Sequence, residues 1–337
     1  MNRDKIRGMF LGIAIGDALF MPVETYDADK IRSLHGRINR YLEPPFAHKW
    51  HKDTKHSGAW TDDTQLTLAV ADSLIEYRGF NMDDLAQRHV DYYRREGDRG
   101  FGATTRNAIK RIESGVHWSE SGKTNNPRHG RGNGLPMKIA PLGAMDCQLI
   151  QGCDFACMTH YTYLGVESAL AHMNAIHACL HSNAIGTRTE IIDTFVASFR
   201  KLQTEKISNR YLQEHFPSIK MGDKSLLEAL LMLRHLPLEK MSAEDFIKLF
   251  GGGSTYVYHS LLFSYAFFLR DPFSIETLYD VGNAGGDTDT NASIVGGMLG
   301  ALNGTSIFPQ HLIDGLWQKD RIINTAERFC DTFCPES

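Results

Sequence analysis

The spacing of apolar residues is the feature that most restricts how this 337-residue chain can fold. Apolar side chains recur every three or four residues in many stretches, and the alternation typical of exposed β-strands is almost absent. Glycine, proline, asparagine and aspartate separate these stretches, as expected for turns. We therefore expect an all-α fold, a single compact multi-helix domain over residues 1–337, with helices near 4–18, 64–78, 82–96, 103–114, 162–181, 188–203, 224–235, 243–250, 257–269, 274–281, 290–302 and 309–332.

Glycine recurs every fourth residue in two of these expected helices, as Gly8, Gly12 and Gly16 in one and Gly296, Gly300 and Gly304 in the other. A glycine inside a helix costs about 1 kcal/mol relative to alanine. The gain that offsets this cost is a close backbone approach along one helix face, the geometry of GxxxG contacts. The first helix leads into Asp17 and the second starts just after Asp289, so tight packing would hold acidic residues rigidly.

Two short acidic clusters, more than two hundred residues apart, offer the ligands of a metal site. One is Trp60-Thr61-Asp62-Asp63-Thr64, and the other is Gly285-Gly286-Asp287-Thr288-Asp289-Thr290-Asn291. Carboxylate and hydroxyl oxygens are the ligands that hard divalent cations such as Mg²⁺ prefer. If the fold brings the two clusters together, they form a site for two metal ions.

The alternative for each cluster is helix capping, because threonine and aspartate before an apolar run are common first-turn residues. Capping needs one suitable residue, whereas each cluster has two carboxylates and a threonine, so the pair favours a metal site. An EF-hand loop starting at Asp287 is excluded, since its sixth and twelfth positions would be Ala292 and Met298 instead of glycine and glutamate.

Composition restricts the partners of the protein. With a net charge of −4 and a pI near 6.4, the chain has no basic excess that would favour nucleic acid or an acidic membrane. The most apolar N-terminal stretch, Met9–Ile15, is short and contains Gly12, so we expect no membrane span and a cytoplasmic location. The six cysteines include no Cys-x-x-Cys pair and are expected to be buried free thiols in a monomer.

In this context the chain resembles the ADP-ribosylglycohydrolase family over about residues 3–318. The resemblance is carried by several motifs in the family's order, and the ordered set is far more specific than any one of them. The motifs are Gly12-x-x-x-Gly16-Asp17-Ala18-Leu19, Pro22-Val23-Glu24, Trp60–Thr64, the segment from Gly132-Asn133-Gly134-Leu135-Pro136-Met137 to Pro141, Thr159-His160, and Gly285–Ala292.

The resemblance implies an all-α fold with two Mg²⁺ ions, or Mn²⁺ in some members, in a cleft. It implies six metal ligands: Thr61, Asp62, Asp63, Asp287, Asp289 and Thr290. Glu24 matches a family glutamate near the metals and, with Asp62 and Asp63, is a candidate catalytic group. Asp98 belongs to a loose match with the family's substrate-side loop, and it is a fourth candidate that could face the arginine of a substrate.

The resemblance also implies a set of substrate-binding residues. The glycine-rich segment resembles a phosphate-holding loop, which agrees with the way backbone N–H groups bind phosphate oxygens. Taken alone, such a segment is as easily a surface loop, a single histidine is more often structural, and a tyrosine at this spacing is more often in the core. The candidates are Gly102, Gly132, Asn133, Gly134, Leu135, Met137, His160 and Tyr256.

One departure from the family pattern is Phe20, where members often have glycine; the large ring could narrow the cleft or fill the core. The activity implied is hydrolysis of the N-glycosidic bond between ADP-ribose and a protein side chain, with arginine as the first choice. Two alternatives stay open. One is hydrolysis of serine-linked or O-acetyl ADP-ribose, or of another small conjugate; the other is a non-catalytic relative that binds ADP-ribose or has a structural role.

Overall fold

The computed structural model describes residues 2–42, 56–126, 128–145, 147–182, 186–205, 214 and 225–334. Over these residues the fold is all-α, as expected, and contains no β-strand. Two isolated bridges, Asp27 with Gly285 and Gly132 with Tyr256, join loops that matter for the candidate site.

The α-helices are α1 (Arg3–Phe20), α2 (Ala28–His35), α3 (Asp62–Tyr77), α4 (Met82–Glu96), α5 (Ala103–Glu113), α6 (Trp118–Ser121), α7 (Ala140–Ala144), α8 (Leu149–Thr159), α9 (Tyr163–His181), α10 (Arg188–Glu205), α12 (Leu226–Met232), α13 (Ala243–Leu249), α14 (Val257–Arg270), α15 (Glu276–Asn283), α16 (Thr288–Asn303), α17 (Gln310–Gly315) and α18 (Lys319–Phe333). Short 3₁₀ helices are η1 (Met21–Val23), η2 (Leu233–His235), η3 (Leu238–Lys240), η4 (Gly251–Gly253) and η5 (Thr305–Ile307).

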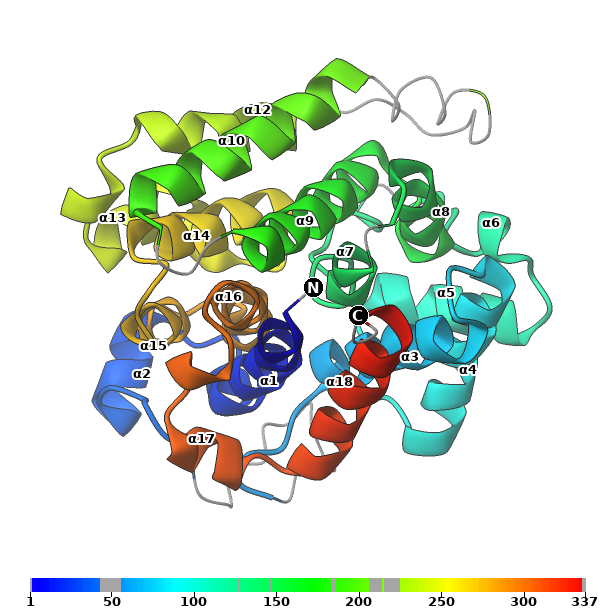
Figure 1. Ribbon diagram of the computed structural model, residues 1–337, viewed down its shortest axis with the longest axis horizontal. Coiled ribbons are helices and arrows are strands. Elements are labelled where there is room, and N and C mark those ends of the chain that lie inside the picture. Colours follow the sequence, from blue (N-terminus) through cyan, green and yellow to red (C-terminus); the bar gives the residue numbers. More distant parts are fainter. Residues whose placement is uncertain are drawn as a thin grey trace.

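Helices α1 and α16 lie side by side in the middle of the molecule and form its most extensive helix–helix contact (Figure 1). The two glycine series face each other across this contact. A Cβ atom added to Gly12 would lie 2.0 Å from the carbonyl oxygen of Gly296, and one added to Gly300 would lie 1.9 Å from that of Gly8. The close backbone approach expected from the glycine spacing is therefore present.

The remaining helices surround this pair. Helices α3 and α18 pack on α1, whereas α9, α14 and α15 pack on α16 (Figure 1). Helices α10 and α12 lie outside α9, and α4 and α5 continue from α3 on another side. Both glycine helices are consequently buried along almost their whole length, which places the last turn of α1 and the first turn of α16 inside the protein.

Most of the expected helices are present within a few residues of their expected ends, and the differences have physical reasons. Helix α2 was missed because it has only eight residues and buries one of them, Ile31, so it contains too few apolar positions to show a repeat. The short helices α6 and α7, and α8 with its internal Gly152, were missed as well. The stretch expected as 309–332 is divided into α17 and α18, because Gln318 adopts a left-handed conformation and Trp317 N–H donates to Gly58.

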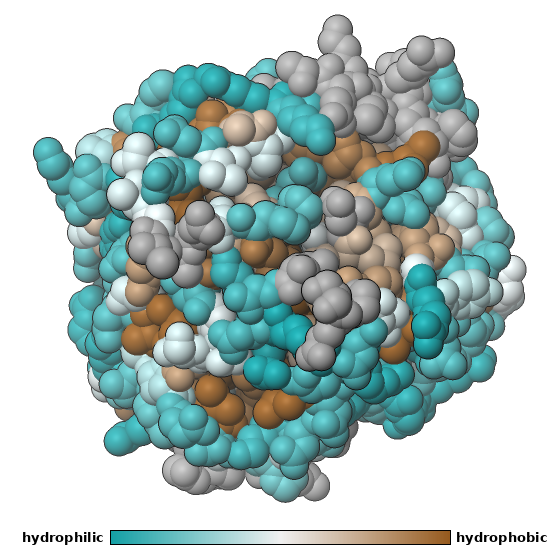
Figure 2. All heavy atoms as spheres, in the orientation of Figure 1, coloured by the Kyte–Doolittle hydropathy of each residue, from teal (hydrophilic) through white to brown (hydrophobic). Residues whose placement is uncertain are grey.

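The length of the first helical segment bears on the expectation that the chain has no membrane span. The segment Arg3–Val23 is long and apolar enough to cross a membrane by length and composition, contrary to our sequence expectation. However, 89% of its most apolar window is buried inside the protein. Figure 2 shows a largely hydrophilic face on which hydrophobic residues form separate small groups.

The cysteines are free thiols, five of them buried and Cys147 half-buried.

Candidate active site

The two acidic clusters converge where α3 and α16 begin. Asp62 and Asp63 occupy the first turn of α3, and Asp289 and Thr290 occupy the first turn of α16. The Thr290 hydroxyl donates to Oδ2 of Asp63 across 3.2 Å, which joins residues 227 positions apart. Sequence reasoning required this convergence for a metal site, and the structure contains it.

Capping does not explain either cluster. Neither Thr61, which precedes α3, nor Asp287, which precedes α16, caps its own helix with its side chain. Helix α3 is instead capped from outside by Asp17 of α1, whose carboxylate accepts the backbone N–H groups of Thr61 and Thr64 at 2.9 and 3.0 Å. It also accepts both threonine hydroxyls, at 2.8 and 2.6 Å. Asp62 and Asp63 are thus not needed as caps.

The loop before α16 brings Glu24 to the second cluster. Gly285 and Gly286 have φ values of 85° and 90°, a region that favours glycine. Their backbone pairs with the segment after η1: Thr25 N–H donates to Gly286 at 2.8 Å, and Gly286 N–H donates to Tyr26 at 2.9 Å. This pairing holds Glu24 beside the start of α16.

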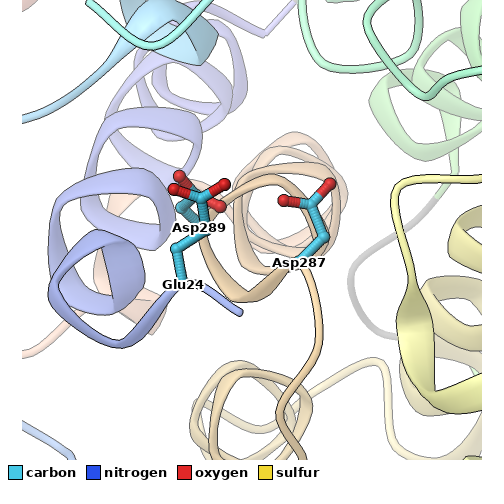
Figure 3. A group of neighbouring side chains, drawn as sticks. All are labelled: Glu24, Asp287 and Asp289. Atoms are coloured by element: carbon cyan, nitrogen blue, oxygen red, sulfur yellow. The ribbon is translucent and has the colours of Figure 1, made fainter. Parts of the chain in front are cut away.

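Glu24, Asp287 and Asp289 form a compact acidic group. One carboxylate oxygen of each lies within 4.8 Å of the others, a spacing that suits a metal ion. Figure 3 shows the carboxylates of Glu24 and Asp289 beside each other and that of Asp287 facing the same space. Asp63 is linked to this group through Thr290.

Burial and mutual repulsion make these carboxylates hard to ionise without a cation. Burial raises the pKa of Asp63 well above its usual range, and the charges of Asp17, Asp62 and Asp287 raise it further. Burial, followed by the charges of Glu24 and Asp287, raises the pKa of Asp289 in the same way. Burial and Glu24 raise the pKa of Asp287 to about 6, although a hydrogen bond from Asn133 opposes the shift.

The residues present fit a divalent metal. The donors are all oxygen atoms, as Mg²⁺ and Mn²⁺ prefer. Oδ1 of Asp63 is buried and has no hydrogen-bond partner in the structure, which is costly for a carboxylate unless a cation binds it. Asp62, Asp63, Asp287, Asp289 and Thr290 also line one cleft, so a bound metal would be accessible to a substrate.

This cleft has a volume of about 530 Å³, a size suited to a small-molecule ligand. Its lining includes Glu24 and the aspartates as well as the basic residues Arg128, His129 and Arg131. Seven of the eight residues expected to bind substrate line it: Gly102, Gly132, Asn133, Gly134, Met137, His160 and Tyr256.

The glycine-rich segment is tied both to the acidic group and to the start of α14. Asn133 Nδ2 donates to Asp287 at 2.6 Å and to the Ser260 hydroxyl at 3.0 Å. Asn133 N–H donates to Thr255 at 3.0 Å, next to the bridge between Gly132 and Tyr256. A side chain at position 134 would be crowded, because an added Cβ would lie 3.0 Å from the His160 ring.

Three predicted site residues do not line the cleft. Leu135 is fully buried in the hydrophobic core. The Thr61 hydroxyl donates its proton to Asp17, so Thr61 can bind a metal only through the lone pairs of its hydroxyl oxygen. Asp98 pairs with Arg106 and accepts the N–H groups of Gly100 and Phe101; although burial raises its pKa, these hydrogen bonds produce a net lowering.

Phe20 fills the core instead of narrowing the cleft. Its side chain is fully buried, and a Cβ on Gly282 of α15 would lie 2.3 Å from its ring. Phe20 is not among the residues that line the cleft. The departure from the family pattern therefore concerns the packing of α1 against α15.

Sequence reasoning gave no role to Asp17, Arg128 and Arg131. Asp17 belongs to a quoted motif, but its function as a cap depends on a contact between α1 and α3 that no local pattern reveals. The two arginines come just before Gly132 in the sequence, and their charges beside a candidate phosphate loop were a usable signal.

Comparisons with known proteins agree with this geometry. Residues 1–336 match the model of the ADP-ribosylglycohydrolase family. The chain is 26% identical to an uncharacterized protein of Archaeoglobus fulgidus, covering 94% of this chain and 92% of that protein. It is 24% identical to the ADP-ribosylhydrolase ARH3 of Xenopus tropicalis, with 90% and 89% covered.

Among solved structures, an ADP-ribosylglycohydrolase-related protein complex superposes with a TM-score of 0.69 at 21% identity, with 98% of each chain covered. This likeness shows the fold. The match of the family model over nearly the whole chain shows more: this protein belongs to the ADP-ribosylglycohydrolase family.

Proposed function

We propose that this protein removes ADP-ribose from modified proteins by metal-dependent hydrolysis of the N-glycosidic bond, with arginine as the modified side chain and two Mg²⁺ ions, or Mn²⁺, as cofactors. One observation carries the proposal: the half-buried carboxylate of Glu24 and buried carboxylates at the starts of α3 and α16 meet at a cleft that a glycine-rich segment also lines. The substrate is thus an ADP-ribosylated protein or a smaller ADP-ribose conjugate.

The two kinds of group in the cleft suit the two ends of such a conjugate. The pyrophosphate is an anion, for which the backbone N–H groups near Gly134 and the side chains of Arg128 and Arg131 are suitable partners. The acidic group suits the ribose whose glycosidic bond is cleaved, because its transition state is positively charged. Metal ions held by Asp62, Asp63, Asp287 and Asp289 would orient the ribose hydroxyls and polarise the attacking water.

The remaining steps belong to residues of this chain. As the bond to the guanidine breaks, positive charge grows at the anomeric carbon and nearby carboxylates stabilise it. Glu24, Asp62 and Asp63 are the candidates that accept the proton of the attacking water. The guanidine leaves with a proton because it is strongly basic.

A linkage panel tests the proposal. Arginine-linked and serine-linked ADP-ribosyl peptides and O-acetyl ADP-ribose are incubated with the protein, with Mg²⁺ and with excess EDTA. We expect release of ADP-ribose from the arginine-linked peptide only, and only in the incubation that contains Mg²⁺ without EDTA. Release from the other two substrates only would establish the alternative linkage.

Absence of hydrolysis of any substrate, combined with tight binding of ADP-ribose, would support a non-catalytic role. Activity that is unchanged in excess EDTA would refute the metal requirement. A protein with Glu24 replaced by glutamine is the matched variant, since it retains the size of the side chain and removes its charge.

A further inference from the structure

Lys138 is a buried charged residue to which neither the metal chemistry nor the proposed substrate contacts give a role. Its side chain is fully buried, and burial lowers its pKa to about 7, although Asp62 opposes the shift. No carboxylate forms an ion pair with it in the part of the chain that the structure describes. Burying an ammonium group without a salt bridge costs folding free energy. The groups around Lys138 therefore indicate which role offsets this cost.

The ammonium group of Lys138 makes one side-chain hydrogen bond, to the hydroxyl oxygen of Thr159 at 3.5 Å. The same hydroxyl lies 2.9 Å from Nδ1 of His160. All three side chains are buried. They form a short chain of hydrogen bonds that ends at a histidine lining the cleft.

The chemistry of the groups sets the direction of these hydrogen bonds. An ammonium group has donors only, so the Thr159 oxygen accepts from Lys138. The hydroxyl also has one proton to donate, and Nδ1 of His160 is the one acceptor within reach of it among the described residues, so we assign the proton to this contact. Burial lowers the pKa of His160 well below its usual value, which favours the neutral ring. A neutral ring whose Nδ1 accepts from Thr159 carries its one proton on Nε2.

The edge of the His160 ring opposite Nδ1 faces the cleft. Cε1 and Nε2 of His160 would lie 3.0 and 3.2 Å from a Cβ on Gly134, so this edge faces the glycine-rich segment of the cleft. With its proton on Nε2, His160 donates a hydrogen bond in this direction. A phosphate, hydroxyl or carbonyl oxygen of the bound conjugate can accept it.

His89 provides a second observation around the same lysine. Its Nδ1 lies 2.7 Å from the carbonyl oxygen of Leu85, so Nδ1 carries the proton and Nε2 has a lone pair. That Nε2 atom is buried without a partner. Burial lowers the pKa of His89 to about 3, and the charge of Lys138 lowers it further. The neutral His89 ring therefore supplies no charge that could balance the buried ammonium.

We propose that Lys138 is a positioning residue: acting through the hydroxyl of Thr159, it holds His160 in the tautomer that donates from Nε2 toward a ligand oxygen in the cleft. The role of the ligand rests on the function proposed above, whereas the tautomer is a property of the protein alone.

Nitrogen NMR of the full chain, labelled with ¹⁵N-histidine and measured without metal or ligand, tests the tautomer directly. At pH 6 the Lys138 ammonium predominates, and the signals of His160 are identified by their loss in His160→Gln. We expect an unprotonated Nδ1 and a protonated Nε2 in the wild type and in Thr159→Ser. Lys138→Met and Thr159→Val should both give a mixture of tautomers.

Lys5→Met is the matched control. Lys5 is another buried lysine, and burial lowers its pKa, but it donates to the carbonyl oxygens of Cys179, Leu180 and Ser182, none of which lines the cleft. Its replacement should leave the His160 tautomer unchanged. A single Nε2-protonated tautomer retained in both Lys138→Met and Thr159→Val would overturn the proposal. If Lys138→Met does not fold, the comparison of Thr159→Val with Thr159→Ser still decides it.

Affinity for ADP-ribose in the presence of Mg²⁺ tests the consequence. Loss of a hydrogen bond to a charged oxygen predicts binding about tenfold weaker for Lys138→Met and Thr159→Val, and unchanged binding for Thr159→Ser and Lys5→Met. Equal affinities in all variants would refute the positioning role. If the wild type itself binds no ADP-ribose, the proposed function fails, while the NMR result still decides the tautomer.

Discussion

The two ends of the α1–α16 contact solve opposite physical problems with the same pair of helices. Along Gly8, Gly12, Gly296 and Gly300 the backbones touch with no side chain between them. Where α1 ends and α16 begins, Asp17, Asp287 and Asp289 are buried instead, and the charges of Asp17 and Asp287 raise the pKa of Asp63 and of Asp289. One end is a neutral, close-packed contact, and the other is a concentration of negative charge.

The comparison shows how a protein can keep repelling groups together. The glycine contact leaves the helices little freedom to separate, because closely packed backbones have no flexible side chains to rearrange. The Thr288 hydroxyl adds a hydrogen bond to the carbonyl of Phe20 at 2.8 Å, close to the acidic end. The neutral contact thus supplies rigidity and the acidic end supplies the chemistry.

The largest effect is expected from a side chain placed between the two helices. Gly300→Leu puts a Cβ within 1.9 Å of the Gly8 carbonyl, so the helices must separate. We expect the free energy of unfolding to fall by more than about 4 kcal/mol, together with loss of Mg²⁺ binding. Urea unfolding and calorimetric titration measure both.

Gly79→Leu is the control for the helix contact, because nothing lies within 4 Å of a Cβ at that glycine. It should leave both quantities nearly unchanged. Retention of full metal affinity in Gly300→Leu would show that the glycine contact does not hold the acidic end in place.

Removing a carboxylate from the acidic end should separate chemistry from stability. We expect Asp289→Ala, and equally Asp62→Ala, to abolish turnover and to remove one metal ion while the protein stays folded, because each residue is a proposed metal ligand at the cleft. Turnover assays and metal analysis check this. The exposed Asp320 of α18 serves as a control, and full activity of either cluster variant in excess EDTA would contradict the two-metal scheme.

Asp17 belongs to both regions, since it lies on the glycine helix and caps α3. In Asp17→Asn one acceptor oxygen becomes a donor facing N–H and O–H groups of Thr61 and Thr64. We expect a loss of about 2–3 kcal/mol of stability and a lower Mg²⁺ affinity, because the first turn of α3 loses its fixed position. An Mg²⁺ affinity equal to that of the wild type would limit Asp17 to a stabilising role.

The smallest effect concerns the pH dependence of the metal-free protein. The pKa of Asp287 in the folded protein, about 6, exceeds its ordinary value of 3.8. The folded state therefore holds this proton more tightly than the unfolded chain, and the contribution to stability is complete below about pH 4 and lost as the pH rises through 6.

Asp287→Asn removes the loss of stability that accompanies ionisation of Asp287, because the amide does not ionise. Without metal it should be about 1–3 kcal/mol more stable than the wild type at pH 7.5, and the difference should shrink at pH 4.5. Saturating Mg²⁺ should reverse the order at pH 7.5, because the wild type gains binding energy that the variant lacks. Thermal unfolding at the two pH values checks both parts, and a variant that is less stable without metal at pH 7.5 would contradict the repulsion.

Several features of this protein could be predicted from the sequence because they depend on local patterns. Apolar spacing predicted the all-α class and most helices, and the glycine spacing predicted a close backbone contact for α1 and for α16. The oxygen-rich clusters predicted the residue types at the site, since ligand chemistry is a property of side chains. Short helices with few apolar residues, such as α2, could not be predicted in this way.

Only the tertiary structure decided which distant groups meet. It placed Thr290 against Asp63, used Asp17 as the cap of α3, and turned Asp98 toward Arg106 and Leu135 into the core. It also aligned Lys138 and Thr159 behind His160. A sequence pattern records what each residue can do, but burial, charge repulsion and hydrogen-bond direction depend on neighbours that are brought together only by folding.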